Sequence, residues 1–153
     1  MIIPRLVSLA LRISQFLCAA VVLGLTAYLL HLTHKHSTGP FGRLTYTVVL
    51  SATSTLASLI WMLPTTPHMV NLIGDLLFCG AWFAVFALLQ DWYEDSLGCG
   101  STWAWSQMGR EGRCGQWNAA QAFAFLAAVF WFASFVLGVV VWSAEKRDRG
   151  RGA

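Results

Sequence analysis

The chain has 153 residues, of which 57% are hydrophobic and only 11% are charged, and its formal net charge is +3 at pH 7. Roughly a quarter of the residues of an average soluble domain are charged, so this composition excludes an ordinary soluble protein. The apolar stretches are uniform, whereas strands of an outer-membrane barrel alternate in hydrophobicity over about ten residues. We therefore predict an all-α integral membrane protein.

Four apolar segments are each long enough to cross a bilayer, because a spanning helix needs about 20 predominantly apolar residues. They cover residues 13–33, 44–63, 69–90 and 117–142, and Asp75 is the one formal charge within them. Residues 1–12 are short, basic and amphipathic, so they are expected to extend the first helix or to lie in the interface as its cap. Residues 143–153 form a basic tail that is too polar and glycine-rich to fold alone. The predicted domain is one membrane unit over residues 13–142.

The connections predict how the four spans are arranged. The first connection contains Gly39, Pro40 and Gly42, which stop helices and turn the chain. The second, residues 64–68, is so short that the second and third spans must form an antiparallel hairpin. Residues 91–116 make the one long loop. We expect an antiparallel up-down bundle of four transmembrane helices with both termini on the same side.

The basic residues favour cytoplasmic termini. That orientation places six of them inside, at Arg5, Arg12, Lys146, Arg147, Arg149 and Arg151, and four outside, at Lys35, Arg43, Arg110 and Arg113. Positive charges prefer the cytoplasmic side of short loops. Cys99 and Cys114 then bracket a loop on the oxidising side, where disulfides persist. We predict a Cys99–Cys114 disulfide; the alternative is two free loop thiols.

Asp75 is the most costly residue of the spans, because a charged side chain in a bilayer normally faces a partner or water. Asn71 lies one helical turn before it, and Cys79 lies one turn after it. One interpretation is an ion or proton site. The favoured interpretation is a structural carboxyl, protonated or hydrogen-bonded to a neighbouring helix, since no predicted span contains a basic partner. The expected partner face is a stripe of hydroxyl side chains on the second span, comprising Thr47, Ser51, Ser54, Thr55 and Ser58.

Aromatic residues of the fourth span form a bulky surface, for which lipid-facing packing is favoured over a sterol or partner contact. This surface comprises Phe123, Phe125, Phe130, Trp131, Phe132 and Phe135. Four tryptophans near span ends predict an interfacial belt, namely Trp61, Trp92, Trp117 and Trp142. Asn118 and Gln121 are expected to tie the long loop to the bundle.

No pattern in the sequence predicts catalysis, a cofactor, nucleic-acid binding or a metal site. The four histidines form no cluster with metal-ligand spacing, and no nucleophile elbow, zinc-protease helix or phosphate-binding glycine loop occurs. The tail residues Lys146, Arg147, Arg149 and Arg151 are predicted to contact anionic lipid headgroups. Their alternative role is that of a flank that fixes the topology.

Three stretches together resemble the MARVEL-domain family, and most closely its small fungal members. They are RLVSLALRISQFLCAAVVLGL at the start, NLIGDLLFCGAWFAVFALL with an acidic residue in the third span, and CGQWNAAQAFAFLA at the start of the fourth. The resemblance covers about residues 5–142. Claudin-like proteins have the same number of spans but carry their cysteines in the first loop, which has none here.

This resemblance implies a non-enzymatic protein that organises membranes, in microdomains, at sites of vesicle traffic or at membrane appositions. It implies no catalytic residues. The expected partners are the bilayer, including sterol- or sphingolipid-rich domains, and other membrane proteins, with a homo-oligomer left open. The expected location is the plasma membrane or a secretory-pathway membrane. The alternative function is a small transporter or channel subunit that uses Asp75 as a membrane-embedded carboxylate.

Overall fold

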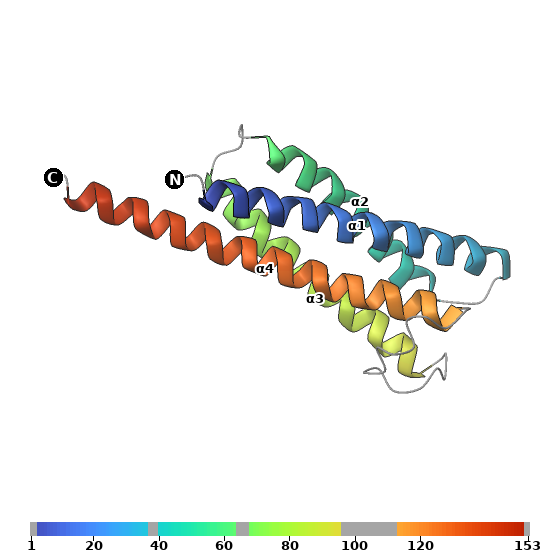
Figure 1. Ribbon diagram of the computed structural model, residues 1–153. Coiled ribbons are helices and arrows are strands. Elements are labelled where there is room, and N and C mark those ends of the chain that lie inside the picture. The colour runs from blue at the N-terminus through green and yellow to red at the C-terminus, as the bar shows by residue number, and fades with distance from the viewer. Residues whose placement is uncertain (1–2, 37–39, 64–67, 96–112, 152–153) are drawn as a thin grey trace.

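The computed structural model describes residues 3–36, 40–63, 68–95 and 113–151, which form four helices (Figure 1). They are α1 (Ile3–His36), α2 (Phe41–Met62), α3 (His68–Asp95) and α4 (Arg113–Arg151). Each helix contains a segment long and apolar enough to span a membrane. The prediction of an all-α protein with four spans is confirmed, and the chain is an integral membrane protein.

The helices run alternately up and down, so both ends of the chain lie at the same end of the bundle (Figure 1). We call this the terminal end, and the end that holds the α1–α2 connection the distal end. The predicted antiparallel topology is confirmed. The side of the membrane that the terminal end faces stays a prediction.

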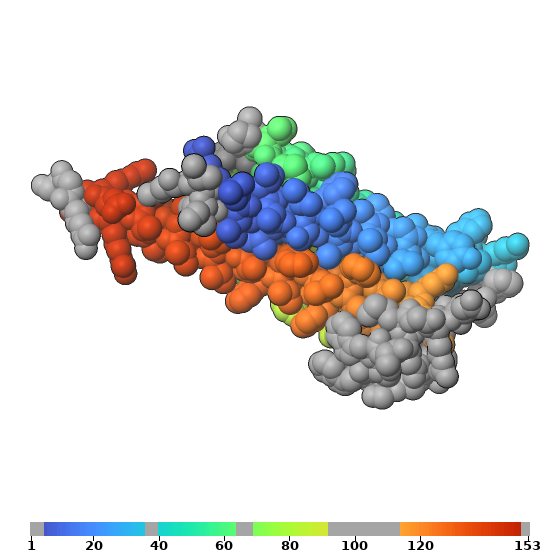
Figure 2. All heavy atoms as spheres, in the orientation of Figure 1, coloured from blue at the N-terminus to red at the C-terminus, as the bar shows by residue number. Residues whose placement is uncertain are grey.

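The helices pack around the bundle in the order α2, α1, α4, α3. The extensive contacts are α1 with α2, α3 with α4, and α1 with α4; of the four neighbouring pairs, α2 and α3 have the smallest contact. The first and last helices lie side by side over one face (Figure 2). Small buried side chains let α4 approach its neighbours closely, and they include Ala120, Ala124, Ala127 and Ala128. The predicted α2–α3 hairpin is therefore antiparallel but loosely packed.

Two helices extend well beyond the predicted spans. α1 begins at Ile3, so the basic N-terminal segment is part of the first helix. α4 continues to Arg151 and carries the basic tail beyond the other helices (Figure 1). The tail does not fold alone; it continues a helix that already exists, and extending a helix needs no new nucleus. Lys146 also lies over the ring of Trp142, at 5.7 Å from the centroid.

The predicted tryptophan belt is wrong for two of its four members. Trp117 is buried, and its indole N–H donates a 2.9 Å hydrogen bond to the carbonyl oxygen of Leu89. Trp61 is half-buried and points into the bundle, as described below. Trp142 is exposed, as an interfacial residue should be. The side chain of Trp92 lies outside the described residues.

Candidate functional site

A buried ion pair joins the first and third helices. Arg12 of α1 donates two hydrogen bonds to the carboxylate of Asp75 of α3, at 2.7 Å to Oδ1 and 3.0 Å to Oδ2. Only 5% of Arg12 and 3% of Asp75 are exposed. A bidentate guanidinium–carboxylate pair is among the strongest polar contacts in proteins, and it fixes the geometry of both groups.

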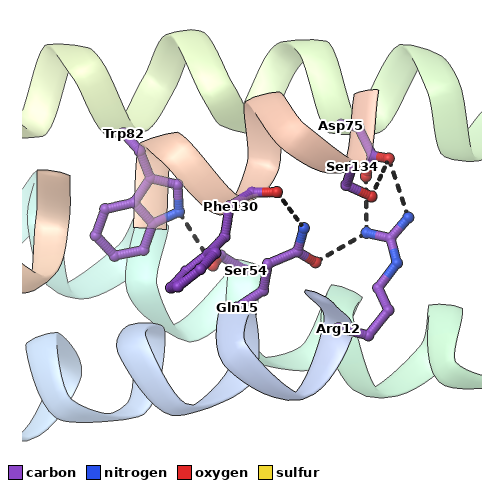
Figure 3. Close-up of polar contacts among 7 residues, drawn as sticks. All are labelled: Arg12, Gln15, Ser54, Asp75, Trp82, Phe130 and Ser134. Atoms are coloured by element: carbon purple, nitrogen blue, oxygen red, sulfur yellow. Dashed lines mark hydrogen bonds and ion pairs between the residues drawn. The ribbon is translucent and has the colours of Figure 1, made fainter. Parts of the chain in front are cut away.

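Neighbouring polar groups complete the hydrogen bonding of this pair (Figure 3). The Ser134 hydroxyl of α4 donates a 2.8 Å bond to Oδ2 of Asp75, and Arg12 donates a 3.0 Å bond to the amide oxygen of Gln15. The Gln15 amide donates in turn to the carbonyl oxygen of Phe130, at 3.2 Å. Each buried charge is thus supported by further polar contacts, which a low-dielectric environment requires.

Aromatic rings surround the cationic side of the pair. The guanidinium carbon of Arg12 lies 5.1 Å from the ring centroid of Trp61 on α2 and 5.4 Å from that of Trp131 on α4. The two indoles meet edge to face, with centroids 5.6 Å apart, and Phe78 stacks on Trp131 at 4.6 Å. A cation within about 6 Å of an aromatic centroid is attracted by the ring quadrupole, more strongly when both are desolvated.

We call this group the four-helix polar cluster, because every helix contributes to it. It comprises Arg12 and Gln15 of α1, Trp61 of α2, Asp75 and Phe78 of α3, and Trp131 and Ser134 of α4. Its charges cancel, and its carboxylate is held by two donors of different helices. The arrangement suits a fixed joint between helices, since it makes their relative positions interdependent.

The structure corrects the predicted surroundings of Asp75 in two ways. The basic partner that no predicted span contained is Arg12, which was assigned to the segment before the first span. The bonds to Asp75 described above come from α1 and α4, whereas the predicted partner face was the hydroxyl stripe of α2. Asp75 is therefore a buried, ion-paired residue, with Arg12 and Ser134 as partners that the sequence did not suggest.

The α2 hydroxyls instead bond mostly to their own helix. Thr47, Ser51, Ser54 and Ser58 are buried and Thr55 is half-buried. Ser51 donates to the carbonyl of Thr47, Thr55 to that of Ser51 and Ser58 to that of Thr55. Ser54 is the exception, because its hydroxyl oxygen accepts a 3.2 Å bond from the indole of Trp82 on α3 (Figure 3).

The predicted aromatic surface of α4 is only partly correct. Phe132 is exposed, as lipid-facing packing requires, whereas Trp131 is fully buried within the four-helix polar cluster. The other phenylalanines are half-buried, and Phe125 packs against Phe83 and Phe86 of α3. Helical geometry explains the difference, because consecutive residues point about 100° apart around the axis.

The distal end has polar contacts of its own. Arg43 of α2 forms a 2.6 Å ion pair with Asp91 of α3 and donates to the carbonyl oxygen of Leu88. This pair is much more exposed than the Arg12–Asp75 pair. Gln121 donates to Gln90, so it joins α4 to α3 near the start of the long loop. Asn118 is buried.

Two cavities flank the four-helix polar cluster. One, of about 220 Å³, is lined by α1, α3 and α4 and reaches Arg12 and Asp75. We call it the vestibule. The other, of about 450 Å³, is an apolar groove lined by residues of α2 and α3, with Trp61 and Gly74 in its wall. It lies along the α2–α3 contact, the smallest of the four contacts between neighbouring helices.

The remaining predicted residues fall in three groups. The tail residues Lys146, Arg147 and Arg149 are exposed on the projecting end of α4. Cys99 lies outside the described residues, so its disulfide with Cys114 stays a prediction. Within the described ranges, no group of three or more metal-binding side chains could hold a metal ion.

Four helices, each with a segment able to span a membrane, meet in the four-helix polar cluster and define a multi-pass membrane protein. The chain matches the profile of the MARVEL family, described as a membrane-associating domain, over residues 4–137. It therefore belongs to the MARVEL family. The match includes all residues of the four-helix polar cluster. No curated protein matches the chain significantly.

Proposed function

We propose that this protein is a non-enzymatic organiser of membranes, which acts in membrane microdomains, vesicle traffic or membrane apposition. Its membership of a family of membrane-associating domains supports a role at the membrane. The observation that carries the proposal is the closed state of Asp75, whose carboxylate is bound by Arg12 and Ser134 within the bundle. A carboxylate bound by side chains of two other helices holds those helices together.

The alternative is a small transporter or channel subunit that uses Asp75. A transported ion or proton needs a carboxylate that can exchange partners and a polar route through the protein. Beyond the ion pair, toward the distal end, the next buried side chains of α3 are Cys79, Trp82, Val85 and Leu89. These α3 side chains offer no charged group beyond Asp75, although α2 contributes the buried hydroxyls of Thr47, Ser51 and Ser54 on this side. The vestibule reaches Asp75 from the terminal end, so this alternative merits a direct test.

The proposal includes an orientation and a setting. We infer that the terminal end faces the cytoplasm of a plasma-membrane or secretory-pathway protein, because the basic residues concentrate there. Its partners would be bilayer lipids, including sterol- or sphingolipid-rich domains, other membrane proteins and a second copy of the chain.

The experiment compares Asp75→Asn with Asp91→Asn. Both remove a carboxylate from α3, but Asp91 is 58% exposed in its side chain and lies at the distal end. The proteins are reconstituted into vesicles for ion and proton flux, and into giant vesicles with coexisting lipid phases for clustering and partitioning. We expect no protein-dependent flux, and altered clustering for Asp75→Asn alone. A flux that Asp75→Asn abolishes and Asp91→Asn preserves would establish the transporter instead.

A further inference from the structure

The vestibule is a cavity with one polar wall, built between two helices whose described contact is the Arg12–Asp75 ion pair. α1 and α3 each contact α4, and α4 lies between them. The polar wall consists of Arg5, Ser8 and Arg12 of α1 with Asn71 and Asp75 of α3. Leu137, Gly138 and Val141 of α4 are part of its apolar wall. The cavity thus offers charged groups and aliphatic surface to the same occupant.

The vestibule runs from the end of the bundle into the membrane. Arg5 and Arg12 are seven positions apart on α1, which is about 10 Å at 1.5 Å per residue. Leu6 and Leu9, beside Arg5, are exposed apolar residues that suit a lipid environment. Arg5 is exposed, and an arginine in such a position directs its charge toward the lipid headgroups. The outer part of the cavity therefore lies where headgroups meet acyl chains.

The vestibule carries one uncompensated positive charge. Asp75 neutralises Arg12, whereas Arg5 has no ion-pair partner among the described residues. The side-chain oxygen of Asn71 is also buried without a hydrogen-bond partner within that part of the chain. A buried acceptor without a donor is costly. An occupant that brings both a negative charge and a hydrogen-bond donor would satisfy both groups.

We propose that the vestibule binds the headgroup of a phospholipid with one net negative charge. Arg5 binds the phosphate, Asn71 accepts a hydrogen bond from a headgroup hydroxyl or ammonium, and the acyl chains run along the apolar wall of α4. The volume of about 220 Å³ is below the roughly 300–1,000 Å³ of pockets for whole drug-sized molecules. It suits a headgroup whose chains remain in the bilayer. Phosphatidylserine satisfies both groups, whereas phosphatidylcholine has no donor and no net charge.

Native mass spectrometry of the full chain in detergent tests this site, with phosphatidylserine, phosphatidylethanolamine and phosphatidylcholine as probes. The variants are Arg5→Gln, which removes the phosphate contact, Asn71→Leu, which removes the acceptor, and Ser8→Phe, which fills the cavity without changing its charge. Arg43→Gln is the matched control, because it removes an arginine at the distal end. Circular dichroism and size-exclusion chromatography establish that each variant is folded.

We expect the wild type and Arg43→Gln to retain phosphatidylserine in preference to phosphatidylcholine. Arg5→Gln should lower the affinity for phosphatidylserine about tenfold, which is the scale of one hydrogen bond to a charged group. Asn71→Leu should weaken the binding of phosphatidylserine and of phosphatidylethanolamine to the same degree. Ser8→Phe should abolish the retention of both lipids.

Three results would overturn the proposal. They are equal retention of phosphatidylserine and phosphatidylcholine by the wild type, unchanged retention in folded Arg5→Gln and Ser8→Phe, and displacement of the lipid by millimolar inorganic phosphate. The last result would assign the vestibule to a soluble phosphate. The measurement uses isolated protein, so its outcome does not depend on the membrane-organising role.

Discussion

The indole of Trp61 on α2 lies directly over Gly74 of α3, so that a Cβ built on Gly74 would overlap the carbons of the ring. The same indole contacts the guanidinium of Arg12 and the rings of Phe78 and Trp131. This is where α2, which packs much less extensively against α3 than α4 does, meets the four-helix polar cluster. Because Gly74 has no side chain, the indole of Trp61 can pack directly against the backbone of α3.

Gly74→Val should therefore destabilise the bundle. The added methyl groups displace Trp61 from Arg12, and overpacking of this kind typically costs about 1–3 kcal/mol. Thermal unfolding in detergent, followed by size-exclusion chromatography, measures the loss. Gly80→Val is the matched control on the same helix, because a Cβ at Gly80 has open space around it. Equal midpoints for the two variants would contradict the close approach at Gly74.

Arg12→Leu should destabilise the protein more than the double variant Arg12→Leu/Asp75→Leu does. Removing one partner of a buried ion pair leaves the other charge uncompensated, which typically costs about 3–5 kcal/mol, whereas apolar replacement of both is often neutral. Unfolding of the wild type, the two single variants and the double variant forms a thermodynamic cycle. Additive losses would show that the two charges do not stabilise each other. The distal Arg43→Gln/Asp91→Asn pair is the reference, since exposed ion pairs contribute little.

The predicted Cys99–Cys114 disulfide can be tested in intact cells. A membrane-impermeant maleimide should label the chain only after a reductant has been added, because the two thiols are bonded and face the oxidising side. Cys18→Ser/Cys79→Ser removes the two buried free cysteines and leaves the loop pair as the only target. Labelling before reduction would exclude the bond, and absence of labelling after reduction would place the loop on the cytoplasmic side.

Replacing Lys146, Arg147, Arg149 and Arg151 by glutamine should reduce the enrichment of phosphatidylserine around the protein. A basic residue near an anionic membrane surface contributes about 1 kcal/mol, which is about a fivefold preference. Energy transfer from the protein to a fluorescent phosphatidylserine in vesicles measures it. Enrichment by the wild-type tail should fall at 1 M salt, where the Debye length is about 3 Å. If phosphatidylserine is still enriched around the variant with all four replacements, another part of the chain causes the enrichment.

The four spans and their alternation could be predicted from the sequence because they depend on the lengths of the apolar segments and of the connections between them. Span length follows from bilayer thickness, and alternation follows from short connections. The ion pair was missed for a related reason. A span defined as an uninterrupted apolar segment excludes Arg12, although α1 includes it. Its position near the terminal end, at a depth similar to that of Asp75, was the signal that could have found it.

Which face of a helix is buried proved harder to predict than the helix itself. A stripe of small hydroxyl residues predicts that α2 faces Asp75, yet α2 packs mainly on α1. Trp61 and Trp117 were placed in an interfacial belt from their positions near span ends, but both point into the bundle. Such preferences depend on which helices are neighbours, and a single sequence does not specify the packing order of four similar apolar helices.

The four-helix polar cluster also determines when the fold can be complete. Arg12 is made with the first helix, its carboxylate with the third, and Ser134 and Trp131 with the fourth. A chain that stops after α2 therefore leaves a buried arginine without its anion, and only the last helix supplies the final hydrogen bond and ring. Assembly of this protein ends with a polar contact that no partial bundle can form.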